Sequence, residues 1–343
     1  AEAPTLDNGV YQISTFNHLR WISENSSSWG ADFIQTADID AAVTAESCYN
    51  SGEGWSSIGN VSTKFTGTYD GDGQTISNLF INRPNEQRIA LFGETNGATI
   101  EHLGLVDPDI TVTGTGQFGM GSNVGSLVGL ADNGTTISEC FASGGVVTAG
   151  GSGVGGLIGQ LLWSSLNNSY AIVTVEGGDA NINYSGGLVG VNSSSTITNC
   201  YAAGSVVFKQ YSGITISRGL TQGTSGITNS FYDSDATGQT TGGGTAKTTA
   251  EMLQQATFTD WDFQCETENG TDDFWGIDEG NDYPRLSWEG IVQLCKSWIG
   301  SINTDWSNPN NWSPSGVPAQ NENLIIDATA QNNLILDQDQ SVG

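Results

Sequence analysis

The sequence predicts an all-β fold built as a three-sided parallel β-solenoid, and two observations carry that prediction. The first is composition: the 343 residues include 47 glycines and only 13% charged residues, about half the usual charged share of ~25%. The second is an internal repeat of about 30 residues. A helical solenoid is disfavoured, because each glycine inside a helix costs about 1 kcal/mol.

The repeat consists of a Gly-x-Leu-x-Gly-like core followed by a second apolar block and then a valine-rich block. The core leucines are Leu91, Leu127, Leu157, Leu188 and Leu220. Their intervals are 36 (127 − 91), 30 (157 − 127), 31 (188 − 157) and 32 (220 − 188) residues. Three short strand-like blocks per repeat, separated by Gly and Asn, describe one coil whose strands stack about 4.8 Å from their equivalents.

Two columns of side chains follow from this alignment. Asn168, Asn199 and Asn229 share one column and suit a left-handed corner, which Asn tolerates. His102 and Glu139 take the same place in earlier coils, so we expect His102 to be structural, with a ligand or base role as the alternative.

The next column contains two cysteines. Cys140 and Cys200 lie two coils apart, or about 9.6 Å at the strand spacing, which is beyond disulfide reach. We therefore expect both to be reduced and buried.

The motifs Gly-Gly-Leu-Val-Gly (186–190) and Ile-Thr-Asn-Cys-Tyr (197–201) resemble the GLUG-motif repeats of bacterial, Bacteroidota-like, cell-surface and adhesin-type proteins. The resemblance spans roughly residues 8–290, and the coil that begins Arg-Gly-Leu-Thr-Gln-Gly at Arg218 departs from the pattern. It implies a right-handed parallel β-helix in a secreted or surface-anchored protein.

The chain divides into four predicted segments. A helical cap over Thr15–Glu24 would cover the apolar end of the first coils. The segments are an N-terminal cap with the first coils (1–88), the repeats (89–245), a C-terminal cap (246–290) and the start of a second, Trp-rich β module (291–343).

The last segment is too short to close a core. Its strand-like runs are Asn323–Asp327 and Asn333–Asp337. We expect either that the parent chain continues or that another subunit supplies strands by edge pairing.

The charge balance restricts the partners. Nine Lys and Arg against 37 Asp and Glu leave 9 − 37 = −28, which argues against nucleic acid and against anionic membrane surfaces. No apolar run approaches the ~20 residues that span a bilayer. We expect an extracellular, cell-surface or secreted protein whose partners are surface glycans, other surface proteins, or further copies in a filament.

An aromatic column predicts a glycan-binding face. Phe141, Tyr170, Tyr201 and Phe231 follow the small Cys/Ser column, so strand alternation would direct them outward, where they could stack on sugar rings. The alternative is a self-packed ladder covered by a neighbouring loop.

The sequence predicts no catalytic residues, because it contains two histidines, His18 and His102, and no metalloprotease, nucleophile-elbow or phosphate-loop motif. The expected function is a non-enzymatic adhesin or filament segment acting as a rigid spacer. A carbohydrate-active β-helix hydrolase or lyase is the alternative, since a hydrolase needs only two carboxylates. The candidate carboxylates are Asp70, Asp72, Asp107, Asp109, Asp233 and Asp235.

We expect no cofactor, with calcium as an open alternative. Asp70 with Asp72, or Asp233 with Asp235, could contribute to such a site, although each pair lacks a full ligand set. The Asp70-Gly-Asp72-Gly run also fits a tight turn. A disulfide between Cys265 and Cys295 near the C-terminal cap is possible, but the sequence does not fix their distance.

Overall fold

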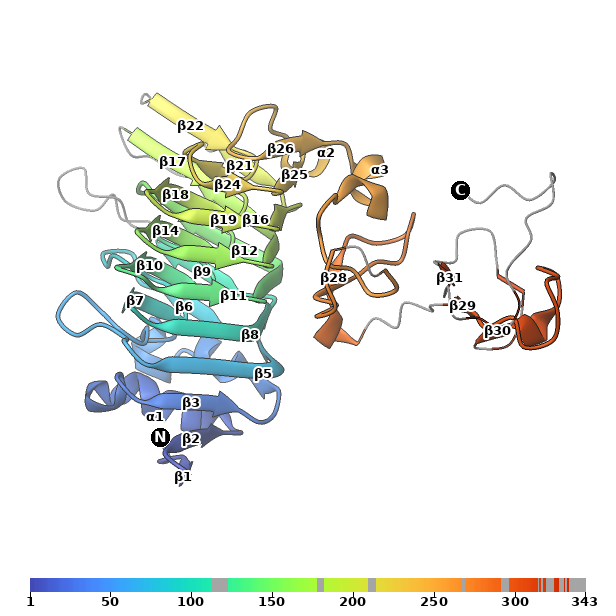
Figure 1. Cartoon of the computed structure of the whole chain (residues 1–343). Helices are drawn as coiled ribbons and strands as arrows, with labels where there is room; N and C mark the ends of the chain where they lie inside the picture. The colour runs from blue at the N-terminus through green and yellow to red at the C-terminus, as the bar shows by residue number, and fades with distance from the viewer. Residues whose placement is uncertain are drawn as a thin grey trace. The chain divides into compact units, whose positions relative to one another are not determined.

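The computed structural model describes the chain except residues 113–122, 178–181, 209–213, 267–268, 291–295, 314, 316, 319–323, 327–329, 331 and 333–343. The chain forms two compact units, Ala1–Thr249 and Ala250–Gly343 (Figure 1). The fourfold division into segments remains a prediction.

The first unit opens with a cap. β1 (Thr5–Asp7) pairs antiparallel with β2 (Val10–Ile13), which lies parallel to β3 (Asp32–Gln35). Helix α1 (Phe16–Glu24) begins after Thr15, whose side chain accepts a hydrogen bond from the His18 amide, as an N-cap residue does. This confirms the predicted cap helix.

Strands of successive repeats then stack in parallel register (Figure 1). One sheet pairs Phe92 with Val128, Val128 with Ile158, Ile158 with Val189, and Val189 with Thr221. Its strands are β7 (Phe92–Asn96), β10 (Val128–Asp132), β14 (Ile158–Leu162), β18 (Val189–Ser193) and β23 (Thr221–Gln222).

The largest sheet contains the second and third blocks of each repeat. Its earlier strands are β4 (Ile39–Asp40), β5 (Thr68–Ser77), β6 (Phe80–Asn82), β8 (Thr99–Val106), β9 (Asp109–Val112), β11 (Thr136–Ser138) and β12 (Phe141–Ala149). Its later strands are β15 (Ser165–Asn167), β16 (Tyr170–Gly177), β19 (Thr196–Thr198), β20 (Tyr201–Ala202), β21 (Val206–Phe208), β24 (Ile227–Thr228), β25 (Phe231–Asp233) and β26 (Thr245–Lys247).

A third, smaller sheet pairs β13 (Val154–Gly155) with β17 (Ile182–Gly186) and β17 with β22 (Ile214–Arg218), again in parallel. The short helix α2 (Ser234–Thr237) lies between β25 and β26, and α3 (Thr249–Met252) follows β26. The described chain is therefore mostly β, with large parallel sheets and few helices.

The core leucines stack as predicted. The Leu127 amide donates to the Leu157 carbonyl at 2.9 Å, and the Leu157 amide donates to the Leu188 carbonyl at 2.9 Å. All three side chains are fully buried. Cys140 and Cys200 are buried free thiols, which confirms the second expectation from the coil alignment.

Glycine is needed at Gly190, where successive coils approach closely. A Cβ on Gly190 would lie 2.5 Å from the carbonyl oxygen of Gly159 and 2.5 Å from the amide nitrogen of Val154. No side chain fits at such distances, so the glycine of the repeat core is fixed by the stacking itself.

The second unit contains two small aromatic clusters. In one, β27 (Trp275–Gly276) pairs antiparallel with β28 (Arg285–Leu286), and the Trp261 and Trp275 rings lie 4.4 Å apart. In the other, β29 (Lys296–Trp298) pairs with β30 (Trp312–Ser313) and β31 (Leu324–Ile326). The predicted strand Asn323–Asp327 corresponds to β31, whereas Asn333–Asp337 lies outside the described residues.

The stacked core predicts a large effect of truncating one leucine. Leu157→Ala should lower the free energy of unfolding by about 2–5 kcal/mol, because it leaves a cavity in a fully buried column. Urea unfolding followed by circular dichroism measures this. Leu6→Ala removes the same atoms from a side chain that is 56% exposed and serves as the control. Equal losses in the two variants would contradict the buried column.

Candidate functional site

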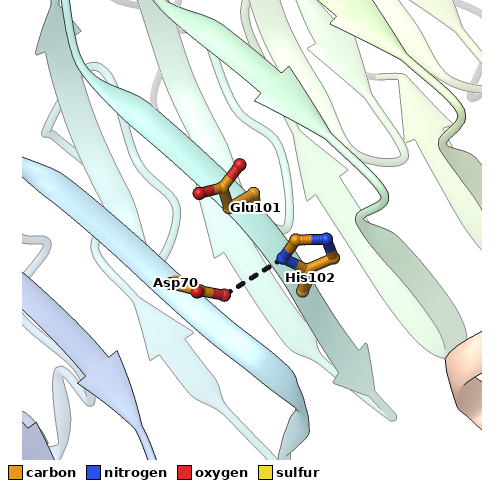
Figure 2. A group of neighbouring side chains, drawn as sticks. All are labelled: Asp70, Glu101 and His102. Atoms are coloured by element: carbon orange, nitrogen blue, oxygen red, sulfur yellow. Dashed lines mark hydrogen bonds and ion pairs between the residues drawn. The ribbon is translucent and has the colours of Figure 1, made fainter.

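Asp70, Glu101 and His102 form a group of chemically active side chains where β5 and β8 pair (Figure 2). Asp70 lies directly opposite Glu101 in the parallel register. His102 has a positive φ of 49°, which interrupts the side-to-side alternation of a strand. The side chains of Glu101 and His102, although consecutive in sequence, can therefore belong to the same cluster.

His102 connects three successive coils. Its Nδ1 lies 3.1 Å from Asp70 Oδ1, and its Nε2 lies 3.2 Å from Glu139 Oε1. The three side chains are half-buried, with exposed fractions of 35% for His102, 31% for Asp70 and 16% for Glu139. Both ring nitrogens thus face carboxylates from neighbouring coils.

The carboxylates stabilise the protonated imidazole. Hydrogen bonds to Asp70 and then to Glu139 raise the pKa of His102 to about 10. The same contact, with His102 as the partner, lowers the pKa of Asp70 below its usual value. At neutral pH the imidazolium therefore donates from both nitrogens to ionised carboxylates.

Glu101 is the uncompensated member of the group. Within the described residues its carboxylate has no hydrogen bond or ion pair, yet it lies opposite the carboxylate of Asp70. One potential ligand atom from each of Asp70, Glu101 and His102 falls within 4.8 Å of the others. Like charges placed directly opposite on paired strands repel.

Other coils show that the fold does not require these residues. The positions equivalent to Glu101 are Ser138, Asn167 and Thr198. The positions equivalent to His102 beyond Glu139 are Asn168, Asn199 and Asn229, all with φ between 42° and 52°. The structure thus confirms the left-handed corner column. In this column the earlier coils have the charged residues His102 and Glu139, where later coils have neutral Asn.

The residues of the two predicted calcium pairs make local contacts, and the calcium site stays a prediction. Asp72 is exposed with a φ of 49°, and its amide donates to Asp70 Oδ1 at 2.9 Å, at the point within β5 where the register with β8 shifts. Asp233 is buried and caps α2 by accepting from the Asp235 and Ala236 amides, while Asp235 accepts from the Thr249 amide. Asp70 alone of the four belongs to the group found here.

The aromatic column does not face solvent, which corrects the expectation of an outward sugar-stacking surface. Phe141, Tyr170, Tyr201 and Phe231 are at most 7% exposed. The Phe141 and Tyr170 rings lie 5.1 Å apart at 5°, and the Tyr170 and Tyr201 rings lie 4.9 Å apart at 7°. In-register coils place these rings face to face, so they form a packed ladder.

A different aromatic residue is exposed, and the sequence reasoning missed it. Trp163 is 61% exposed and has a φ of 46°. It occupies the corner that Gly97, Asn133 and Ser194 occupy in other coils, also with positive φ. The sequence offered one signal for this residue: Trp163 stands at a repeat position where the other coils have Gly, Asn or Ser.

Two remaining predictions concern residues near the ends. His18 lies in α1, where its Nδ1 accepts from the Ser14 amide at 3.3 Å, a local contact of the cap. Cys265 is disulfide-bonded, and its predicted partner Cys295 lies outside the described residues. None of the described helices is long and apolar enough to cross a membrane.

Comparison with known proteins gives a family match for part of the chain. Residues 181–207, which contain β17 to β20 and the start of β21, match the GLUG motif. This segment includes one complete Gly-Gly-Leu-Val-Gly core and the corner at Asn199.

Two curated relatives cover larger stretches of this chain. Halomucin of Haloquadratum walsbyi is 36% identical over 204 residues, 57% of this chain and 2% of that protein. A provisionally named Gly-rich membrane protein of Evansella cellulosilytica is 42% identical over 134 residues, 36% of this chain and 14% of that protein. The chain therefore corresponds to a small part of the relatives it matches.

One solved structure is similar over most of the chain. Its title assigns it provisionally to the immunoglobulin A1 proteases, from Bacteroides ovatus. It covers 81% of this chain and 92% of its own, with a TM-score of 0.49 and 18% sequence identity. A likeness of this degree says nothing about activity.

The imidazolium contacts predict a pH-dependent stability. Because the folded-state pKa of His102 is raised to about 10, its contribution is complete below its unfolded pKa of about 6.5 and is lost as the pH rises through 10. Partial exposure and screening by solvent limit it to about 1 kcal/mol. The loss in unfolding free energy caused by His102→Asn should therefore be largest near pH 6 and fall towards zero above pH 10.

Urea unfolding of both proteins across this range, with EDTA present, measures the difference. Asn is the residue of the equivalent corners, so the variant keeps a side chain that tolerates the left-handed backbone. A difference in unfolding free energy that stays constant with pH would contradict the contacts of His102 with Asp70 and Glu139.

Proposed function

We propose that this chain is a segment of a non-enzymatic extracellular surface protein of adhesin or filament type, in which stacked coils act as a rigid spacer. The observation that carries the proposal is the continuous parallel register from β7 through β23. A strand stack of this kind resists bending, because each coil is held by backbone hydrogen bonds to the next.

The coil geometry supports a right-handed three-sided parallel β-helix as the underlying architecture. Connections between parallel strands of one sheet are right-handed in nearly all proteins. The three sheets and the repeat intervals fit one turn of the chain per repeat.

The comparisons support a surface location. The GLUG match and the similarity to a protein named as a mucin and another named as a membrane protein point in this direction. The formal charge of −28 with few lysines fits an extracellular setting. The chain spans 2% and 14% of the length of these relatives.

The glycan-binding face of this proposal is centred on Trp163. An exposed indole can stack on the apolar face of a sugar ring. Asn133 and Ser194 occupy the same corner one coil to either side, about 4.8 Å away at the strand spacing. Both are exposed and offer hydrogen-bonding groups to sugar hydroxyls.

The alternative of a polysaccharide hydrolase or lyase has less support from the charged group. Acid–base pairs in glycosidases need one carboxyl group whose pKa is raised. Here His102 lowers the pKa of Asp70, and His102 itself stays protonated at neutral pH, so neither is suited to act as a proton donor and base at pH 7.

One pair of assays separates the two functions. The full chain is applied to a glycan array and, in parallel, incubated with a panel of polysaccharides while reducing ends and unsaturated products are measured. Binding without product formation is expected. Turnover that is lost in Asp70→Asn would overturn the non-enzymatic assignment. Antibody labelling of intact producing cells tests the surface location separately.

Trp163→Asn should abolish glycan binding and also stabilise the fold. The indole is lost, and a residue that tolerates the left-handed conformation replaces one that pays about 1 kcal/mol for it. Array binding and urea unfolding measure the two effects. Tyr170→Phe, which alters a buried ladder ring, should leave array binding unchanged. Retained binding in Trp163→Asn would exclude this corner as the glycan site.

A further inference from the structure

We propose that Asp70, Glu101 and His102 form a binding site for a first-row transition-metal dication such as Zn²⁺, with Glu139 orienting the imidazole. The proposal is independent of the spacer function and of the glycan site, and its failure would leave both unaffected.

The three ligand groups are already assembled. Asp70 and Glu101 face each other in the register of β5 and β8, and His102 follows Glu101 directly (Figure 2). One candidate ligand atom of each lies within 4.8 Å of the other two, so small side-chain rotations bring all three to a common ion. Two carboxylates and one imidazole leave further coordination positions open to water.

Glu139 supplies the outer contact that a metal-binding histidine requires. A ligating imidazole commonly donates its second N–H to a carboxylate, which fixes the tautomer and the ring orientation. His102 Nε2 lies 3.2 Å from Glu139 Oε1, while Nδ1 is the nitrogen that faces Asp70. Metal binding at Nδ1 would release the proton shared with Asp70 and leave the Nε2 contact intact.

The charge of the group favours a dication. Asp70, Glu101 and Glu139 contribute −3 and a protonated His102 contributes +1, so the cluster has −3 + 1 = −2. Replacing the proton by a dication gives −3 + 2 = −1. Glu101, which has no partner among the described residues, would gain one.

The imidazole selects the class of metal. Calcium and magnesium take oxygen ligands, whereas imidazole together with carboxylates suits zinc and its first-row neighbours. Later coils place Ser, Asn or Thr at the positions equivalent to Glu101, and Glu139 followed by Asn168, Asn199 and Asn229 at those equivalent to His102. The ligand set is therefore confined to these first coils.

Isothermal titration of the EDTA-treated full chain with Zn²⁺ at physiological ionic strength tests the site, and Co²⁺ absorption reports a nitrogen-containing ligand set. The titrations use a Cys48→Ser background, because Cys48 is an exposed free thiol. One saturable Zn²⁺ per chain is expected. His102→Asn and Glu101→Ser, which install residues of the equivalent corners, should weaken binding about 100-fold or more, and Glu139→Gln about tenfold.

Asp109→Asn is the matched control, since it removes an exposed carboxylate of β9 outside the group; its affinity should equal that of the parent. Circular dichroism of each variant serves to check that it is folded. Equal affinity in His102→Asn and the parent, or the absence of saturable binding in the parent, would overturn the proposal. The proposal would also be overturned if Glu101→Ser and Asp109→Asn lowered the Zn²⁺ affinity by the same small factor, because that pattern indicates diffuse attraction of the ion to an acidic surface.

Discussion

Parallel in-register stacking is the constraint on which the rest of this structure depends. Each residue lies about 4.8 Å from its equivalent in the next coil, so the chemistry of a position is repeated along a column. Leucine on leucine forms the core, and glycine on glycine permits a close approach of successive coils, as where a Cβ on Gly190 would lie 2.5 Å from the Gly159 oxygen. Amide-bearing asparagines take the left-handed corners. The same rule makes a column of like charges costly, because the repulsion is repeated at each coil.

That constraint explains which features the sequence could predict. The leucine core, the left-handed Asn corner and the buried reduced state of Cys140 and Cys200 follow directly from repeat phase, and the structure has all of them. The prediction that the aromatic column faces solvent was wrong. Strand alternation gives the side of the strand from which a side chain projects, but it does not show whether other residues cover that side. Phe141 and Tyr170 became a stacked, buried ladder instead.

The charged group was only half predicted, for a related reason. Placing His102 and Glu139 in one column was correct, but Asp70 was paired with Asp72, its neighbour in sequence. Its actual partner, His102, is 32 residues away, and Glu139 lies 37 residues beyond His102. An irregularity in β5 between Asp70 and Gln74 shifts its register with β8, so the first coil could not be aligned by counting from the later repeats.

Two departures from the repeat remain costly to the fold and are not required by it. Trp163 adopts a left-handed conformation where other coils use Gly, Asn or Ser, and Glu101 faces Asp70 where later coils use neutral side chains. The Trp163 corner precedes β15, and Glu101 lies within β8, which belongs to the same strand column of β8, β11, β15 and β19. Other coils of this chain have neutral side chains at the position of Glu101 and Gly, Asn or Ser at the position of Trp163, so the repeat itself requires neither residue. The glycan contact proposed for Trp163 and the metal site proposed at Glu101 would each give these side chains a favourable contact that the fold does not supply.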